Sequence, residues 1–512
     1  MAIGTITSSR GYLTQQLTTL SRTLTEKTGQ LATGKVATTY GGVGNQRQLD
    51  LELGQKVQRI EAYQETITMS RLHIKTLNLN LERLEKLRIQ AKDAMDLNNF
   101  ELQADGQTST QATAEILLTE AISLLNSEVG GHFLFGGSDA NTNPVLQMDQ
   151  ILNGVDGKAG LKQVLSEFWQ ANRGASQLGR LNMSALTTTL DGFGQPLTSS
   201  FTVTEDGAHN FGFDIKAVTS NMSNVTLTPP TGVDPDNFGV QLTGQPLPGQ
   251  KITVELALPP SGAKTTKIEL TAAASGNSPN TFLVGADLAQ TAANLRTAMT
   301  TALQEQANTT LRAASDEWAA NSFFDSFAGN PPMRVAGPPF DTATTLVNGS
   351  ATTTSWYIGE NTATTDPRQD KIAAVDDNLR LGYGVRANEN GLASVVKALS
   401  TFIAGDFSAN TSTDEKYYSA LADRMKATIQ PEGTARSGIV DITTEVAIAF
   451  RSIEYTAERH TTLKSGYKGT IAEIEGIDKE TLAVEIVQLQ TMLEASYRAS
   501  SIAMKMSLAD YL

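Results

Sequence analysis

The string that comes closest to a catalytic motif is Gly29-Gln-Leu-Ala-Thr-Gly34-Lys35-Val36. It is similar to the glycine-rich loop that cradles nucleotide phosphates, which requires Ser or Thr after the lysine to reach Mg²⁺ and an apolar strand before the first glycine. Here Val36 follows the lysine, and the preceding segment has helical spacing. We therefore interpret Gly34 as a helix stop and Lys35 as a cation near the negative end of the helix dipole.

Other residue types that do chemistry are scarce or scattered. Cysteine is absent, which excludes thiol catalysis and cysteine metal sites. The four histidines are far apart in sequence, and none belongs to a metal-binding motif such as HExxH: His73, His132, His209 and His460. We read His73 and His460 as structural histidines with satisfied ring nitrogens. We predict no catalytic residue, no cofactor and no metal ligand, while a glycosidase-like carboxylate pair in the central region stays open without a motif to favour it.

Composition narrows the possible partners. The chain has 512 residues and a formal net charge of −14, which argues against nucleic acid as a partner. No run of eighteen apolar residues exists, so we expect no membrane insertion. The first residues lack a basic region followed by an apolar one, so we expect no cleaved signal peptide.

Proline divides the chain into three parts. The first proline is Pro144, fifteen of the sixteen prolines lie between Pro144 and Pro367, and only Pro431 follows. Because proline breaks helix interiors, long helices are permitted on both sides of this central region. The predicted fold class is α+β, with a long antiparallel helical bundle or coiled-coil stem made from both chain ends and an inserted β-rich central domain. The expected domains are a terminal assembly domain of residues 1–45 and 476–512, a helical rod of residues 46–143 and 386–475, and outer domains over residues 144–385.

Apolar residues near both ends of the chain recur at alternating steps of three and four. This spacing places a narrow apolar stripe on a helix, as in the seam of a coiled coil. The predicted seam residues are Leu13, Leu17, Leu20, Leu24, Leu31, Ile442, Val446, Ile453, Leu463, Leu482, Ile486, Leu489 and Leu493. We favour an assembly surface for these stripes over the alternative, the core of a self-contained bundle.

Local patterns predict the elements around these stripes. We expect helices over about 12–33, 51–97, 109–128, 391–402, 414–429 and 439–467, and a last helix capped by Asp478. Residues 1–10 are small and polar, and we expect them to order only on binding. A short hairpin is expected near Gly131, and a loop around Pro431.

The centre has the period of strands. Six runs that alternate apolar and polar residues predict a mostly antiparallel sheet or a small barrel. The runs begin near Phe201, Phe211, Val225, Val240, Ile252 and Ile268. A helix from Leu288 and one more strand over 356–358 complete the expected centre.

These strings together resemble the flagellin superfamily and, within it, the hook–filament junction proteins (hook-associated protein 3). The segment ending in Leu31-Ala-Thr-Gly-Lys35 is similar to the family's N-terminal signature, and Gly131-His-Phe-Leu-Phe-Gly136 is similar to its outgoing hairpin. The closing Ser507-Leu-Ala-Asp-Tyr-Leu512 looks more like the tail of a junction protein than that of a filament flagellin. The family's Asp-Asp-Pro segment is replaced here by Thr39 to Arg47.

The resemblance implies a structural, non-enzymatic subunit of the bacterial flagellum, an organelle of motility. Such proteins are secreted unfolded by type III export, without a cleaved signal, and act outside the cell. The implied partners are other copies of the chain, hook-associated proteins, flagellin, and an export chaperone on the C-terminal helix. The alternative functions are a filament flagellin and, more remotely, a surface-displayed enzyme or adhesin on a flagellin-like stem.

Overall fold

The structure is a computed structural model that describes residues 3–96, 99–260, 262–276, 278–362, 365–430 and 437–509. It is a mixed helix-and-sheet fold, in agreement with the α+β prediction. The chain forms two compact units. Unit 1 comprises Met1–Arg71, Ala373–Leu381 and Phe450–Leu512, and unit 2 comprises Leu72–Ile372 and Gly382–Ala449. The long helices α2 (Arg47–Ala94) and α10 (Gly438–Glu475) contribute residues to both units, so the unit boundaries differ from those expected from the proline distribution.

Unit 1 is built mainly from helix pairs. Its further elements are α1 (Ile3–Thr33), the single turns η1 (Tyr40–Gly42) and η2 (Gly44–Gln46), α11 (Lys479–Ala509), and most of the two-stranded sheet of β14 (Ile372–Asp376) and β15 (Leu379–Gly382). Ion pairs show that α2 and α10 run antiparallel here, since Arg71 contacts Glu454 and Glu61 contacts Lys464.

The first helix begins earlier than predicted. We expected residues 1–10 to lack order, but α1 begins at Ile3. In the part of α1 whose side chains are described, threonine hydroxyls donate to the carbonyl oxygen four residues back, as Thr18 does to Thr14 at 2.8 Å and Thr23 to Thr19 at 2.9 Å. A helix therefore accommodates this threonine-rich composition, because each hydroxyl finds an acceptor within the helix itself.

The other helical elements belong to unit 2. They are α3 (Ser109–Leu125), α4 (Met148–Asn153), α5 (Leu161–Arg173), α6 (Leu288–Gln306), the π-helical turn η3 (Ala307–Leu311), α7 (Arg312–Phe324), the 3₁₀ turn η4 (Pro367–Asp370), α8 (Asn390–Ala404) and α9 (Ser412–Ile429). A capping box between Thr108 and Gln111 begins α3 where the sequence predicts. The predicted hairpin is also confirmed, with β1 (Glu128–Val129) antiparallel to β2 (His132–Phe133).

The strands of unit 2 form two principal sheets. The first has the order β3-β5-β8-β7, with β4 also paired to β5, and all of its pairs are antiparallel. Its strands are β3 (Leu181–Met183), β4 (Thr187–Leu190), β5 (Pro196–Glu205), β7 (Val225–Thr228) and β8 (Asn237–Leu242). The second has the order β11-β10-β9-β6, in which β10 and β11 are parallel. Its strands are β6 (Asp214–Ser220), β9 (Lys251–Ala257), β10 (Thr265–Ala273) and β11 (Thr281–Leu283).

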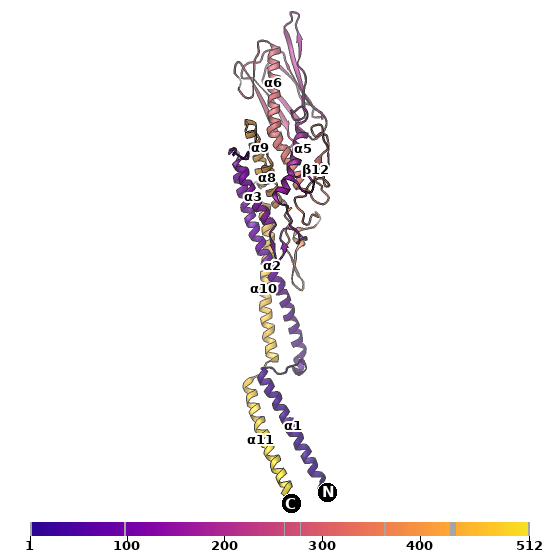
Figure 1. Ribbon diagram of the computed structural model, residues 1–512, viewed down its shortest axis with the longest axis vertical. Helices are drawn as coiled ribbons and strands as arrows, with labels where there is room; N and C mark the ends of the chain where they lie inside the picture. Colours follow the sequence, from indigo (N-terminus) through magenta and orange to yellow (C-terminus); the bar gives the residue numbers. More distant parts are fainter. Residues whose placement is uncertain are drawn as a thin grey trace. The chain divides into compact units, whose positions relative to one another are not determined.

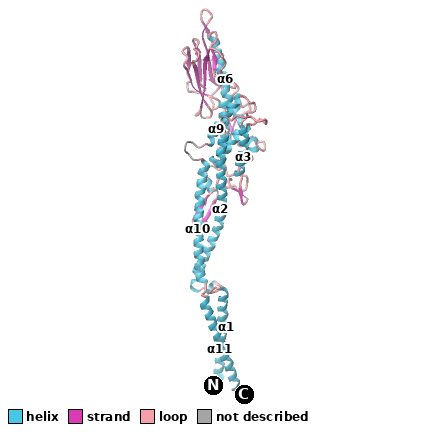
Figure 2. Ribbon diagram, turned by 90° about the vertical axis from the view of Figure 1, so that its left-hand side faces the viewer, coloured by secondary structure: helices cyan, strands magenta, loops and turns pink. Residues whose placement is uncertain are grey.

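Residues of both sheets and of α6 share one hydrophobic core. Phe201 and Val240 from the first sheet, Val254 from the second, and Leu295 and Met299 from α6 are all buried in it. Figure 2 shows α6 alongside these strands. The six predicted runs all contribute strands, but they form two sheets sharing a helix-covered core, and no barrel closes among the described residues.

One local prediction needs correction. No strand forms at 356–358, because Trp356 is buried against Phe324 and only Tyr357 makes an isolated bridge, to Val145. The smaller strands β12 (Met333–Val335) and β13 (Leu346–Asn348) form a hairpin of their own. The predicted loop at 431–436 lies outside the described residues. Among the described residues, no helix combines the length and apolar character needed to cross a membrane.

Candidate assembly surface

The two terminal helices form an antiparallel pair within unit 1 (Figure 1). Lys27 of α1 lies 2.7 Å from Glu485 of α11, and Lys35 lies 2.7 Å from Glu475 at the end of α10. Both ion pairs are partly exposed, so each contributes little stability, on the order of 1 kcal/mol or less. Their value is positional, because the first pair fixes which turn of α1 faces α11 and the second joins the segment after α1 to the end of α10.

A compact joint connects the ends of these helices. Gly34 has a φ of +71° and ends α1, as predicted, because this left-handed conformation strains any residue with a side chain. The backbone N–H of Val36 donates to the carbonyl of Glu475 at 2.7 Å. The Asp478 carboxylate accepts the backbone N–H groups of Glu480 and Thr481, which confirms its predicted role as a cap.

The predicted seam residues of the terminal helices face each other unequally. All five seam leucines of α1 are half-buried, whereas most of their neighbours are exposed. On α11, Leu482 and Ile486 are buried, but Leu489 and Leu493 are only half-buried. The pair therefore closes best near the joint and less well along the rest of α11.

On α10 the seam departs from the prediction at one position. Ile442, Val446 and Ile453 are buried, but Leu463 is 38% exposed and lies outside the seam. Its neighbour Lys464 takes the inward position and reaches Gln64 and Glu61, at 3.0 and 3.1 Å. The next seam residue after His460 is therefore four positions later instead of the predicted three. An α-helix has about 3.6 residues per turn, whereas a strict heptad has 3.5, so an extra step of four keeps the seam on the same face.

Sequence analysis missed a second set of apolar residues on α11, which we call the outer residues. They are more than half exposed: Val484, Val487, Met492, Tyr497 and Ile502. At 100° per residue, Val484, Val487 and Ile502 lie opposite the seam, and Met492 and Tyr497 lie on its flanks. A helix that is apolar on all sides is normally buried on all sides. The apolar residues outside the seam of α11 could therefore have been recognised in the sequence.

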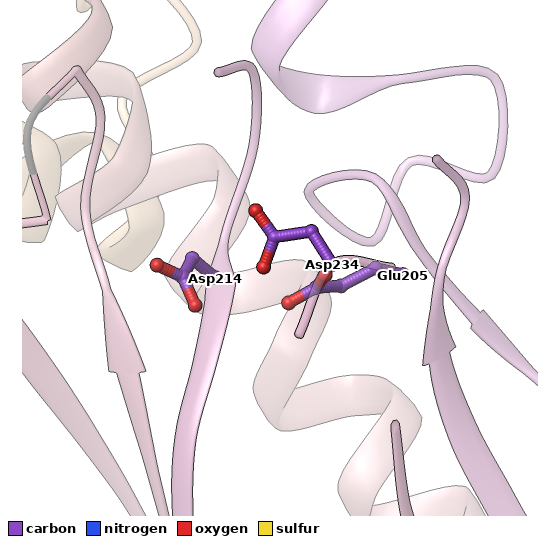
Figure 3. Close-up of side chains that lie close together, drawn as sticks. All are labelled: Glu205, Asp214 and Asp234. Atoms are coloured by element: carbon purple, nitrogen blue, oxygen red, sulfur yellow. The ribbon is translucent and has the colours of Figure 1, made fainter. Parts of the chain in front are cut away.

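A cluster of carboxylates is the other chemically notable group. Glu205 ends β5, Asp214 begins β6 and Asp234 lies in the loop before β8, and their oxygen atoms converge within 4.8 Å (Figure 3). The three residues border a cavity of about 190 Å³ that Arg180 and His209 also line. No sequence motif marks the cluster, because its members come from three separate segments.

Local partners account for two of these carboxylates, Glu205 and Asp214. Each oxygen of Glu205 accepts one backbone N–H, from Ile215 and from Asp236, both at 2.8 Å. Burial raises the pKa of Glu205, and the neighbouring carboxylates of Asp234 and Asp214 raise it further, against the lowering effect of the two amide donors. Asp214 also pairs with Lys216 at 2.6 Å. The arrangement is compatible with a cation but does not require one.

The histidines do not come together in the structure. His209 contacts Arg180 and Asp206, and His73 lies 3.5 Å from the Tyr383 hydroxyl. His460 is buried beside Tyr63. Its Nδ1 and the Nε2 of His73 have no hydrogen-bond partner in the described part of the chain, so the expectation of satisfied rings is wrong for both histidines.

No protein-family model matches this sequence, and no curated protein sequence matches it. The function must therefore be argued from the residues and their geometry.

Proposed function

We propose that this chain is a structural, non-enzymatic subunit of the bacterial flagellum that joins the hook to the filament. In this proposal both chain ends form a helical stem, residues 144–385 form an outer domain, and the chain is exported unfolded and assembled outside the cell through its terminal helices. The proposal rests on the resemblance of the chain ends to the flagellin superfamily and on the surface of the terminal pair.

The single observation that carries the proposal is that α11 presents apolar side chains on every face but has one partner helix. Among the α11 residues whose side chains are described, Leu482 and Ile486 are the buried ones, whereas the five outer residues are between 56% and 60% exposed. Covering each outer side chain would contribute about 1 kcal/mol or more. A pair of isolated helices is marginal in water, so a surface of this kind is stable when neighbouring subunits cover it.

The proposed partners come from the resemblance to the flagellin superfamily, and the exposed apolar surface of the terminal pair supports them. Outside the cell, other copies of the chain, hook-associated proteins and flagellin cover the terminal pair. Before export, a chaperone covers α11 and prevents premature association. The same surface also suits a filament flagellin, and the number and position of copies in the flagellum separate these two functions.

The experiment compares two matched changes on α11 in a strain that lacks the native gene copy. Val484→Ser with Val487→Ser removes two outer residues without touching the α1 contact, and Gln490→Ser is a control at an exposed polar position. We expect the double variant to be exported normally but to assemble poorly, with loss of motility, while the control behaves as wild type. Normal assembly of the double variant would contradict the proposed role of the surface.

A further inference from the structure

Unit 2 contains a stack of alternating arginine and aromatic side chains outside the assembly surface. The Arg312 guanidinium lies 4.1 Å from the ring centre of Tyr417 and 4.5 Å from that of Trp169. Arg173 lies 5.1 Å from the Trp169 ring centre. The four residues come from α5, α7 and α9, so three helices meet at the stack.

The two arginines of this stack have no anionic partner. Within the described residues, no carboxylate oxygen lies within 4.0 Å of either guanidinium, and Arg312 makes no hydrogen bond through its side chain. Arg173 donates from Nη2 to Gln177 at 2.8 Å, but its Nε is buried without a partner. The indole Nε1 of Trp169 is also buried without a partner. Buried donors normally have acceptors, so the Nε of Arg173 and the Nε1 of Trp169 together indicate that an acceptor is missing.

Three other half-buried or buried arginines of unit 2 pair with carboxylates. Arg180 pairs with Asp206, Arg334 with Glu167 and Arg424 with Glu317. Arg173 and Arg312 differ because their guanidinium groups lie over aromatic rings. The hydrogen-bond acceptor that the described residues offer them is the side-chain amide of Gln177, which Arg173 contacts. Both residues are half-buried, so part of each side chain remains exposed to solvent.

An unusual backbone feature places Arg312. The turn η3 at Ala307–Leu311 is π-helical and directly precedes Arg312, the first residue of α7. A π turn widens the helix by one residue and rotates everything that follows it, and such turns are frequent at functional sites. The α6–α7 segment thus departs from regular α-helix where Arg312 enters the stack.

The nearest acidic side chains do not serve as the missing acceptor. Asp316, one turn after Arg312, accepts a hydrogen bond from the Tyr417 hydroxyl at 2.6 Å. Asp406 accepts from the hydroxyl of Ser408, at 2.7 Å. Arg312 influences both carboxyl groups electrostatically, but neither forms an ion pair with it.

We propose that Arg173, Trp169 and Arg312 form a binding site for an oxyanion, a phosphate or carboxylate group of a ligand. The two guanidinium groups supply planar sets of donors that match such oxygens, and the indole N–H supplies one more. Aromatic stacking holds both cations in position without using their donors.

The test measures binding of inorganic phosphate and of glucuronate by the full chain, labelled with 5-fluorotryptophan, at constant ionic strength. The chain has three tryptophans, and the resonance of Trp169 is identified by its loss in Trp169→Phe. We expect saturable movement of this resonance, while that of Trp356, whose Nε1 already donates to Phe324, stays in place. Which of the two anions moves it identifies the oxyanion class.

The matched variants are Arg312→Gln and Lys162→Gln, which remove the same charge; Lys162 is exposed on α5 and outside the stack. We expect Arg312→Gln to lose about tenfold or more in affinity and Lys162→Gln to bind as wild type. Arg173→Gln, which leaves the Tyr417 contact intact, repeats the test if Arg312→Gln folds poorly. Absence of any shift with either anion, or equal weakening by the Lys162 control, would overturn the proposal.

Discussion

The buried carboxyl group of Asp316 makes the stability of unit 2 depend on pH. The carboxyl is 3% exposed, and burial raises its pKa to about 6, against the lowering influence of Arg312 and the Tyr417 hydroxyl. The folded pKa is thus above the unfolded value of 3.8. Such a group contributes stability that is fully present below the unfolded pKa and is lost as the pH rises through the folded pKa, by on the order of 3 kcal/mol.

Replacing Asp316 by Asn should therefore stabilise unit 2 at pH 7 relative to wild type and have little effect at pH 4. The amide keeps an acceptor for the Tyr417 hydroxyl but does not ionise. All three tryptophans belong to unit 2, so their fluorescence during thermal unfolding at several pH values measures the effect. Asp423→Asn, an exposed change on α9, is the control. A wild-type-like pH profile for Asp316→Asn would refute this assignment.

A second residue-scale prediction concerns the ion pair of Glu167 and Arg334. Glu167 is 1% exposed, and Arg334 Nε donates to it at 2.6 Å. Arg334→Met leaves a buried carboxylate without its cation, so we expect a loss of roughly 3–5 kcal/mol in the free energy of unfolding of unit 2. Lys251→Met breaks the exposed pair with Glu269 and should cost about 1 kcal/mol or less. Denaturant titration followed by tryptophan fluorescence compares the two variants, and equal losses would contradict this account.

At the scale of elements, the terminal helices should differ in local stability along their length. Among the described side chains of α11, Ile486 is the last buried one, and the later seam positions Leu489, Leu493, Ser496 and Ser500 are half-buried. In the free monomer, we expect amide hydrogen exchange to be fast over 482–512, fastest toward the end, and slow in the central strands β5 and β8. Strong protection of the last thirty amides in the monomer would contradict the view that α11 is completed by a partner.

Element prediction from sequence succeeded where one period persists. Ile60, Ile67, Ile74 and Leu81 are spaced seven residues apart, which predicts a long helix, and all four residues are buried on α2. It failed at Trp356, where aromatic packing replaces strand pairing. It also missed α5, whose apolar positions have helical spacing within the domain predicted to be β-rich. The choice between Leu463 and Lys464 depends on helix drift relative to a partner, which a single helix does not reveal.

The candidate sites could be predicted only where their residues lie within one element. The seam residues could be predicted because each stripe lies within one helix. The carboxylates Glu205, Asp214 and Asp234 and the stack around Arg312 could not, because they depend on contacts between segments distant in sequence. The outer residues of α11 are an intermediate case, since their apolar character is local but their exposure depends on how many helices surround them.

At the scale of the whole molecule, the proposed function separates assembly from the fold of unit 2. Deleting residues 480–512 removes nearly all of α11, which belongs to unit 1. We expect the truncated chain to lose assembly and chaperone binding, while the thermal unfolding of unit 2 measured by tryptophan fluorescence is unchanged. A truncated chain that still enters flagella would contradict the assembly role, and a collapse of unit 2 would contradict its independence.

The most direct test of the central claim is to count and locate the chain in intact flagella by immunogold labelling. A subunit that joins hook to filament predicts a few copies per flagellum, confined to the boundary between the two. Label along the whole filament would instead indicate a filament flagellin, and absence of label from flagella would contradict the flagellar function altogether.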